Sequence, residues 1–250
     1  MELLILAIFG LIVGSFLNVV IWRLSVGEKL TGRSRCRHCH QQLYWYHNIP
    51  LVSFFYLRSR CAFCRQPISW QYPLVEAVTA VWFALGAVLI PGGQWLMLLT
   101  YLVLVSYLIV LFVFDWQYMI LPDSLTLSGT VVLLILNLLI GRSWLDLVVG
   151  AAVGAGWFAL QYYWSRGRWV GAGDIRFGLL MGVALGWRYT IMALIIAYWL
   201  GAVVALIMLA LKRARRDTQL PFGTFLAVAT WLVFVGGSLI WQWYGAWLGL

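Results

Sequence analysis

The chain is a succession of long apolar segments separated by short polar ones. Hydrophobic residues make up 64% of its 250 residues and charged residues only 10%, which lies outside the usual range for soluble domains. A helix needs about 20 apolar residues to cross a bilayer, and continuously apolar runs favour helices over a barrel. We therefore predict an all-α polytopic membrane protein with about eight transmembrane helices. Their expected ranges are 3–22, 74–90, 94–114, 124–140, 144–164, 176–188, 189–211 and 225–246.

One polar insert separates the first predicted helix from the others. We expect three parts: a first transmembrane helix at 1–22, a loop at 23–72 and a membrane-embedded core at 73–250. The first segment begins Met1-Glu2 without a basic stretch and lacks a clear small-residue cleavage site. These features favour a retained helix over a cleaved signal peptide.

The basic residues follow the ends of the predicted helices. A net charge of +9 can indicate nucleic-acid binding, so the positions of the charges matter more than their sum. If the 23–72 loop faces the cytoplasm, all 17 Lys and Arg residues except Arg142 and Arg188 lie on the cytoplasmic side. This bias follows the positive-inside rule and puts both termini on the opposite side. We expect contact with anionic lipid and no nucleic-acid partner.

All four cysteines and all three histidines lie in the 23–72 loop. Cys36 and Cys39 form one C-x-x-C pair, and Cys61 and Cys64 form a second, a pattern typical of tetrahedral Zn²⁺ sites. A site of four thiolates is closed, so we predict a structural zinc that folds a loop too small for its own core. His40 is an alternative ligand in place of one cysteine.

Two other interpretations of the cysteines are weaker. Disulfides require an oxidising compartment, whereas the charge bias places the loop in the reducing cytoplasm. Residues 36–40 also match the haem-attachment pattern C-x-x-C-H, but such haem is attached outside the cytoplasm, and the second pair would remain unexplained.

We expect two acidic residues to lie at the same depth in the membrane. Asp115 closes an apolar run, and Asp174 follows the glycines Gly171 and Gly173, in a chain with only 8 acidic residues. Two carboxylates in a partly dehydrated site do not both ionise readily, so one keeps its proton while the other deprotonates water. This chemistry hydrolyses amides without a metal. The alternative is that both are helix-end acids at the membrane interface.

The glycines and a third acid have simpler roles. Gly171 and Gly173 leave the backbone bare, which permits positive φ and the close approach of an extended substrate. Membrane helices also use glycine for packing. Asp123 follows Pro122 at an expected helix start, so we interpret it as a cap.

The sequence does not place the residues that other hydrolase mechanisms require where those mechanisms would need them. A serine protease needs a histidine or lysine base, but the histidines are confined to the loop, and Lys29 and Lys212 lie outside the apolar helices. The zinc-protease motif H-E-x-x-H does not occur in the sequence.

A series of short motifs resembles one known family. The motifs are residues 14–21 (GSFLNVVI), 45–46 (WY), 48–51 (NIPL), 68–76 (ISWQYPLVE), 121–123 (LPD) and 221–223 (PFG), together with G-x-G-D at 171–174. In this order they resemble the bacterial type IV prepilin peptidases, which are intramembrane aspartyl proteases of the G-x-G-D kind.

The resemblance implies a function and its residues. Asp115 and Asp174 would be the catalytic aspartates. The substrates would be precursors of type IV pilins or type II secretion pseudopilins, cut between a glycine and usually a phenylalanine on the cytoplasmic face of the bacterial inner membrane. Many members then methylate the new N-terminus with S-adenosylmethionine. Glu76 is our candidate for orienting or deprotonating that amine, and its alternative role is that of an acid at a helix N-terminus.

Three positions depart from the pattern of the family. Arg176 stands where lysine is frequent, His47 where an acid is frequent, and Thr224 where a second proline is common. Arginine and lysine are not equivalent at a close contact. The His47 change removes an acid from the loop and bears on methylation more than on cleavage.

Two other classes of protein remain as alternatives. A proton-coupled transporter would use the paired acids as a relay, although the sequence shows no convincing internal repeat. A scaffold subunit of a secretion machine would use the zinc loop as a docking surface. The sequence leaves the oligomeric state open.

Overall fold

The computed structural model describes residues 1–90, 92–213 and 218–248. Arg215 and Arg216, which belong to the basic residues predicted on the cytoplasmic side, lie outside these ranges. The chain forms two compact units, the N-terminal unit Met1–Val110 and the C-terminal unit Leu111–Leu250.

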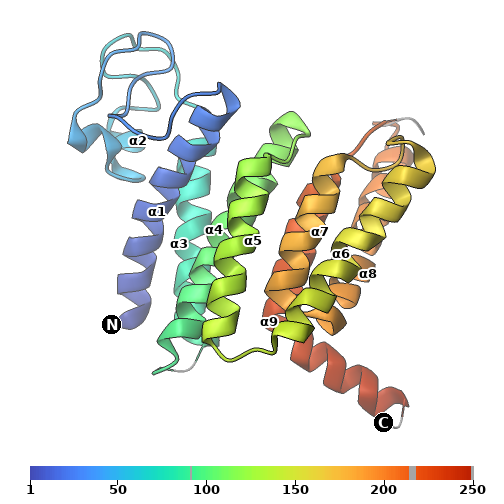
Figure 1. Cartoon of the computed structure of the whole chain (residues 1–250). Helices are drawn as coiled ribbons and strands as arrows, with labels where there is room; N and C mark the ends of the chain where they lie inside the picture. The colour runs from blue at the N-terminus through green and yellow to red at the C-terminus, as the bar shows by residue number, and fades with distance from the viewer. Residues whose placement is uncertain (91, 214–217, 249–250) are drawn as a thin grey trace. The chain divides into compact units, whose positions relative to one another are not determined.

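Regular structure in the described residues is helical, apart from two isolated β-bridges in the loop. The helices are α1 (Glu2–Ser25), η1 (Trp45–Asn48), α2 (Val52–Tyr56), α3 (Gln71–Leu89), α4 (Trp95–Tyr118), α5 (Asp123–Leu139), α6 (Trp144–Ser165), α7 (Ala172–Leu185), α8 (Trp187–Ala210) and α9 (Phe222–Leu248), drawn in Figure 1. The all-α prediction is confirmed.

Six of these helices are long and apolar enough to cross a membrane: α1, α3, α4, α6, α8 and α9. The protein is therefore a multi-pass membrane protein. The other two expected segments are also helical, but α5 has 17 residues and α7 has 14. Eight crossings remain a prediction, because these two helices are shorter than the length that spans a bilayer unaided.

In the N-terminal unit, α1 packs closely on α3 and the loop lies where α1 ends and α3 begins (Figure 1). A Cβ atom on Gly10 would lie 2.7 Å from Cα of Ala80, and one on Gly14 would lie 2.7 Å from Cα of Glu76. Small residues thus let the two backbones approach, as is common between membrane helices. Arg23, at the end of α1, is buried and donates hydrogen bonds to the carbonyls of residues 29, 30, 32 and 33. These bonds hold the start of the loop on the helix.

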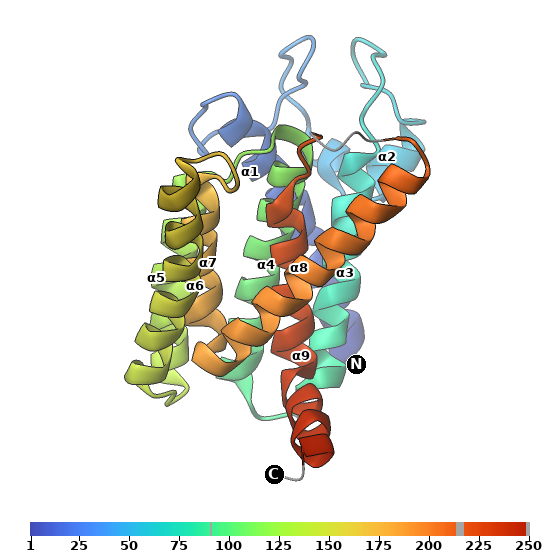
Figure 2. The same ribbon diagram turned by 90° about the vertical axis from the view of Figure 1, so that its right-hand side faces the viewer.

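In the C-terminal unit, α7 is central and contacts α5, α6, α8 and α9; Figure 2 shows the α8 and α9 side of this unit. Gly178 and Gly182 of α7 pack backbone to backbone on Gly154 and Gly150 of α6. Most of α7 is buried, which explains why so short a helix is stable here: it is surrounded by protein. This packing sets the position of its first residues, where Asp174 lies.

Two side chains, one just before α6 and one in its first turn, bind the chain where α7 ends and α8 begins. Arg142 donates to the carbonyls of Ala184 and Leu185, and Asp146 accepts a hydrogen bond from the backbone N–H of Trp187 at the start of α8. Between the two helices Gly186 has φ +80°, which an L-residue rarely adopts. The chain therefore reverses from α7 into α8 within one residue.

Candidate functional site

Asp115 lies in the last turns of α4 and faces the start of α9. Its carboxylate accepts a hydrogen bond of 2.9 Å from the backbone N–H of Thr224, and the residue is only 5% exposed. A Cβ atom on Gly223 would lie 2.9 Å from Cγ of Asp115, so only glycine leaves room for the carboxylate. The positive end of the α9 dipole thereby stabilises the buried charge.

Asp174 is the third residue of α7 and lies at the N-terminus of its own helix. Its Oδ2 accepts a hydrogen bond of 2.9 Å from the backbone N–H of Gly171, and the residue is 8% exposed. Gly171 has φ −79° and Gly173 is helical, so neither glycine uses positive φ. Gly173 is instead required for packing, because its Cβ would lie 3.0 Å from Cβ of Leu121.

Leu121 brings the surroundings of the two acids together. Its side chain contacts Gly173 beside Asp174 and also lies 3.1 Å from where a Cβ of Gly223 would stand, beside Asp115. The two carboxylates are close enough to repel each other electrostatically. The structure thus places both acids in one buried region of the C-terminal unit. The end of α4 and the starts of α7 and α9 form this region.

The other acids of this unit that the structure describes have different surroundings. Asp123, at the start of α5, forms an exposed ion pair with Arg176 of α7. Asp146 also accepts a hydrogen bond from a helix N-terminus, but its side chain is 33% exposed and it lies beside the end of α7 opposite to Asp174. Capping a helix is therefore not distinctive. Burial together with the proximity of a second carboxylate distinguishes Asp115 and Asp174 from the other described acids of the unit.

The four cysteines form one cluster in the loop. Their Sγ atoms all lie within 4.8 Å of one another, and the group found among the described residues contains no histidine, so His40 is not part of it. Cys36, Cys39, Cys61 and Cys64 can therefore hold one metal ion.

The two cysteine pairs have the same local fold. In the first, the N–H of Cys36 bonds to the carbonyl of residue 41 and the N–H of His40 bonds back to Cys36, with φ +56° at His40. In the second, Cys61 bonds to the carbonyl of residue 66 and Arg65 bonds back to Cys61, with φ +59° at Arg65. A β-bridge flanks each turn. The C-x-x-C spacing thus forms two matching turns whose thiols converge.

The thiols do not ionise independently. Although partial burial opposes it, hydrogen bonds from the backbone at Cys39 and its neighbour lower the pKa of the Cys36 thiol to about 7. Gln66 lowers the pKa of Cys64 through its backbone, but burial and the neighbouring thiols outweigh this and raise that pKa to about 11. Ionisation of one thiol therefore raises the free-energy cost of ionising the next, and a bound divalent cation would remove that cost.

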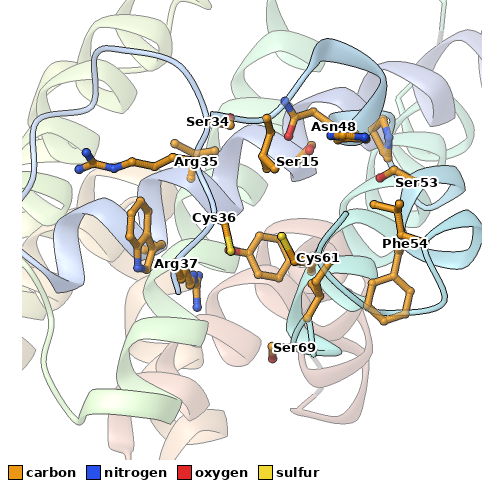
Figure 3. A pocket seen from close by; sticks show the side chains of 18 of the residues that line it. Ser15, Ser34, Arg35, Cys36, Arg37, Asn48, Ser53, Phe54, Cys61 and Ser69 are labelled. Atoms are coloured by element: carbon orange, nitrogen blue, oxygen red, sulfur yellow. The ribbon is translucent and has the colours of Figure 1, made fainter. Parts of the chain in front are cut away.

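A cavity of about 620 Å³ lies in the N-terminal unit between α1, the start of α3 and the loop (Figure 3). Glu76 lines it, is only 6% exposed, and accepts a hydrogen bond of 2.8 Å from the backbone N–H of Leu51. Leu51 has φ +59° just before α2, so the carboxylate holds a strained turn of the loop. Glu76 therefore has a structural partner as well as access to the cavity.

Arg37 also lines the cavity, and the sequence had not indicated it. Its guanidinium carbon lies 4.9 Å from the ring centre of Tyr72 and 5.6 Å from that of Trp22. The sequence feature that could have indicated Arg37 is its position between Cys36 and Cys39. Because the two cysteine turns converge, the residues enclosed by each pair take a fixed orientation.

The fold and these sites define a class: a helical multi-pass membrane protein with a loop whose four cysteines can hold one metal ion, and with two neighbouring buried aspartates. Two family profiles match the chain, "Bacterial Peptidase A24 N-terminal domain" at residues 8–90 and "Type IV leader peptidase family" at residues 102–206. The chain belongs to the type IV leader peptidase family.

Several named relatives are similar to this chain over most of its length. A protein of Aeromonas hydrophila is 34% identical over 95% of this chain and 91% of its own length, and one of Pectobacterium carotovorum subsp. carotovorum is 36% identical over 89% of each. A protein of Myxococcus xanthus (strain DK1622) is 41% identical over 86% of this chain and 65% of its own length. All three are named prepilin leader peptidase/N-methyltransferase. No solved structure matches the chain.

Proposed function

We propose that Asp115 and Asp174 are the catalytic pair of this prepilin-processing peptidase. The observation that carries the proposal is their shared, buried position, with each carboxylate anchored by one backbone N–H at a helix N-terminus. The substrates would be type IV prepilins or type II secretion pseudopilins, cut at a Gly/Phe-type site. The names of the relatives, which are peptidases, favour this function over a transporter or a scaffold subunit.

The geometry supports acid–base hydrolysis of a peptide bond. Two neighbouring carboxylates share one proton, because their charges repel in a site with little water. The ionised acid removes a proton from water, whose oxygen attacks the carbonyl carbon while the neutral acid donates its proton to the carbonyl oxygen. The C–N bond then breaks and the leaving amine takes up a proton. The backbone hydrogen bonds fix the rotation of each carboxylate. The entropy cost of orienting the two groups for reaction is therefore small.

Gly171 is proposed to leave room for the substrate backbone, whereas Gly173 packs on Leu121. A Cβ atom on Gly171 would meet only Asp174 Oδ2, at 3.7 Å, and the backbone N–H of Gly173, at 3.9 Å. A side chain at Gly171 would therefore project beside the carboxylate of Asp174, into the space through which an extended peptide would approach it.

The orientation follows from the charges. We propose that the 23–72 loop and the aspartates face the cytoplasm of a bacterium, with the protein in the inner membrane, 1–22 as its first helix and 73–250 as its peptidase core. The loop is basic, and the positive-inside rule places such loops in the cytoplasm. The basic leader would then be removed on the side where it is made.

The second activity is N-methylation, with a structural Zn²⁺ in the loop. When bound, S-adenosylmethionine supplies an electrophilic methyl group: the amine nitrogen forms the new C–N bond, the C–S bond leaves its electron pair on sulfur, and the amine loses one proton. The relatives are named N-methyltransferases. The carboxylate of Glu76 lines a cavity and is suited to orient the amine or to accept its proton.

Leader removal tests the catalytic pair. Purified protein would be incubated with a model prepilin and the products followed by intact mass. Asp115→Asn and Asp174→Asn keep an oxygen that accepts the backbone N–H but cannot act as acid or base. We expect cleavage to fall by roughly a hundred- to ten-thousand-fold in each. Asp146→Asn is the matched control, because that acid also caps a helix but lies apart from the pair.

Two results would count against the proposal. Either asparagine variant cleaving at the wild-type rate would remove that residue from the catalytic pair. Folded, metal-loaded wild type that cleaves none of several prepilins would overturn the function itself. A gain of one methyl group on addition of S-adenosylmethionine would establish the second activity.

A further inference from the structure

The cavity of the N-terminal unit has polar groups that neither the aspartate pair nor the metal site uses. Its volume of about 620 Å³ falls within the range of sites for small organic ligands, about 300–1,000 Å³. Aromatic side chains form much of its wall: Phe16, Trp22, Trp45, Phe54 and Tyr72. Figure 3 shows Arg35, Arg37 and Phe54 around the same space as Cys36 and Cys61.

Arg37 is preorganised to bind an anion. Its guanidinium stacks near the rings of Tyr72 and Trp22, at 4.9 and 5.6 Å from their centres, which restrains its plane. Its Nε is buried and has no hydrogen-bond partner among the described residues. A buried donor without a partner is costly, so a ligand that accepts from it would recover that cost. A carboxylate matches the guanidinium fork.

Two further groups define what else the ligand must carry. His47 lines the cavity and its Nδ1 is a second buried atom without a partner in the described structure. Glu76 is the single acidic residue of the described lining. The cavity therefore offers both a cation and an anion between aromatic walls.

This combination selects one chemical class of ligand. An apolar ligand would leave the charges of Arg37 and Glu76 unpaired. A nucleotide phosphate would suit Arg35 and Arg37 but would be repelled by Glu76. A zwitterionic amino acid that carries a flat heterocycle satisfies all three features.

We propose that this cavity binds S-adenosylmethionine and that Arg37 holds the α-carboxylate of its methionine part. The aromatic walls would take the adenine, and Glu76 would face the cationic part of the ligand. This inference rests on the proposed methyltransferase function, and it assigns that function to a cavity within the N-terminal unit.

A different role for Arg37 is to neutralise the thiolates of the metal site, since Cys36 is its neighbour in sequence and also lines the cavity. The two roles differ in what the loss of Arg37 changes. Charge neutralisation predicts a loss of metal, whereas carboxylate binding predicts a loss of affinity only for ligands that carry the carboxylate.

The test is a binding titration on the purified full-length protein, by calorimetry. The probes are S-adenosylhomocysteine, which has the amino-acid part, and 5′-methylthioadenosine, which lacks it. For Arg37→Gln we expect the affinity for S-adenosylhomocysteine to fall about tenfold or more, and that for methylthioadenosine to change at least several-fold less. Arg33→Gln is the matched control, because Arg33 lies in the same loop but does not line the cavity. Zinc content is measured in every variant.

Equal weakening of both probes, or no weakening of either, would overturn the assignment of Arg37. If Arg37→Gln loses zinc, Arg37→Lys keeps the charge and loses the fork, and it must still weaken S-adenosylhomocysteine selectively. Wild type that cleaves a prepilin but binds neither probe would overturn the cavity assignment and leave the peptidase standing. If wild type binds both probes and Arg37→Gln weakens only S-adenosylhomocysteine, but wild type cleaves no prepilin, the peptidase function is overturned and the binding-site assignment stands.

Discussion

Asp115 near the end of α4 accepts a hydrogen bond from the backbone N–H of Thr224, which lies 109 residues later at the start of α9. The bond ties two distant helices together at the proposed catalytic carboxylate. Thr224 occupies a position where the family that the sequence resembles often has proline, which has no N–H to donate. In this chain the departure therefore supplies a direct contact to Asp115.

Gly223→Ala should displace Asp115 and reduce leader cleavage by roughly a hundredfold. The added Cβ would lie 2.9 Å from both Cγ and Oδ2 of Asp115, and a displacement of about 1 Å in a catalytic group costs that much. Initial rates of cleavage measure the effect. Gly236→Ala is the control in the same helix, since its Cβ would meet nothing within 4 Å. Similar rates in both variants would show that space beside Asp115 is not critical.

Gly154→Ala should destabilise the C-terminal unit. Its Cβ would collide with the backbone of Gly178, in the contact by which α6 holds α7, and overpacking of this kind costs about 1–3 kcal/mol. Thermal unfolding in detergent would show a lower midpoint. Gly156→Ala in the same helix has open space around its Cβ and should leave the midpoint unchanged. A midpoint equal to wild type in Gly154→Ala would mean that α6 and α7 pack less closely than described.

Removal of the metal should unfold the loop while the membrane helices remain. A chelator takes away the metal, and Cys61→Ser takes away one ligand of a cluster whose thiols converge within 4.8 Å. We expect loss of bound zinc in elemental analysis and rapid proteolysis within residues 23–72. His40→Ala should keep its zinc, because His40 is not in the cluster. Loss of zinc from His40→Ala instead would make the histidine a ligand.

Glu76→Ala should loosen the turn at Leu51, whereas Glu76→Gln should not. The alanine variant leaves the Leu51 N–H without its acceptor, at a cost of about 1–3 kcal/mol, and the glutamine oxygen still accepts it. Limited proteolysis near residues 49–57 reports on the turn. If Glu76 also acts on the amine, Glu76→Gln should keep the turn and lose methylation. Equal protease resistance in both variants would remove the structural role.

The sequence by itself was sufficient for the apolar helices and for the local pattern of the cysteines, but not for the short helices η1 and α2 of the loop. Whether a segment enters a membrane depends on the summed transfer free energy of its own residues, so apolar runs predict helices without knowledge of their neighbours. The C-x-x-C turn is equally local, since the first cysteine of each pair forms backbone hydrogen bonds with residues only four or five positions away. Asp115 and Asp174 were also visible in the sequence, because they lie beside apolar runs in a chain with only 8 acidic residues. The resemblance then implied a catalytic role for them.

Only the tertiary structure decided how these pieces meet. The contact of Gly173 and Gly223 with Leu121, the bond from Thr224 to Asp115 and the cavity shared by Arg37 and Glu76 join residues that are 39 to 109 positions apart. Such contacts depend on how closely whole helices approach, which glycines such as Gly154 and Gly178 set through backbone contact. The residues that bear charge were visible in the sequence. Their partners follow from packing, because a helix places a side chain only after its own position among the other helices is determined.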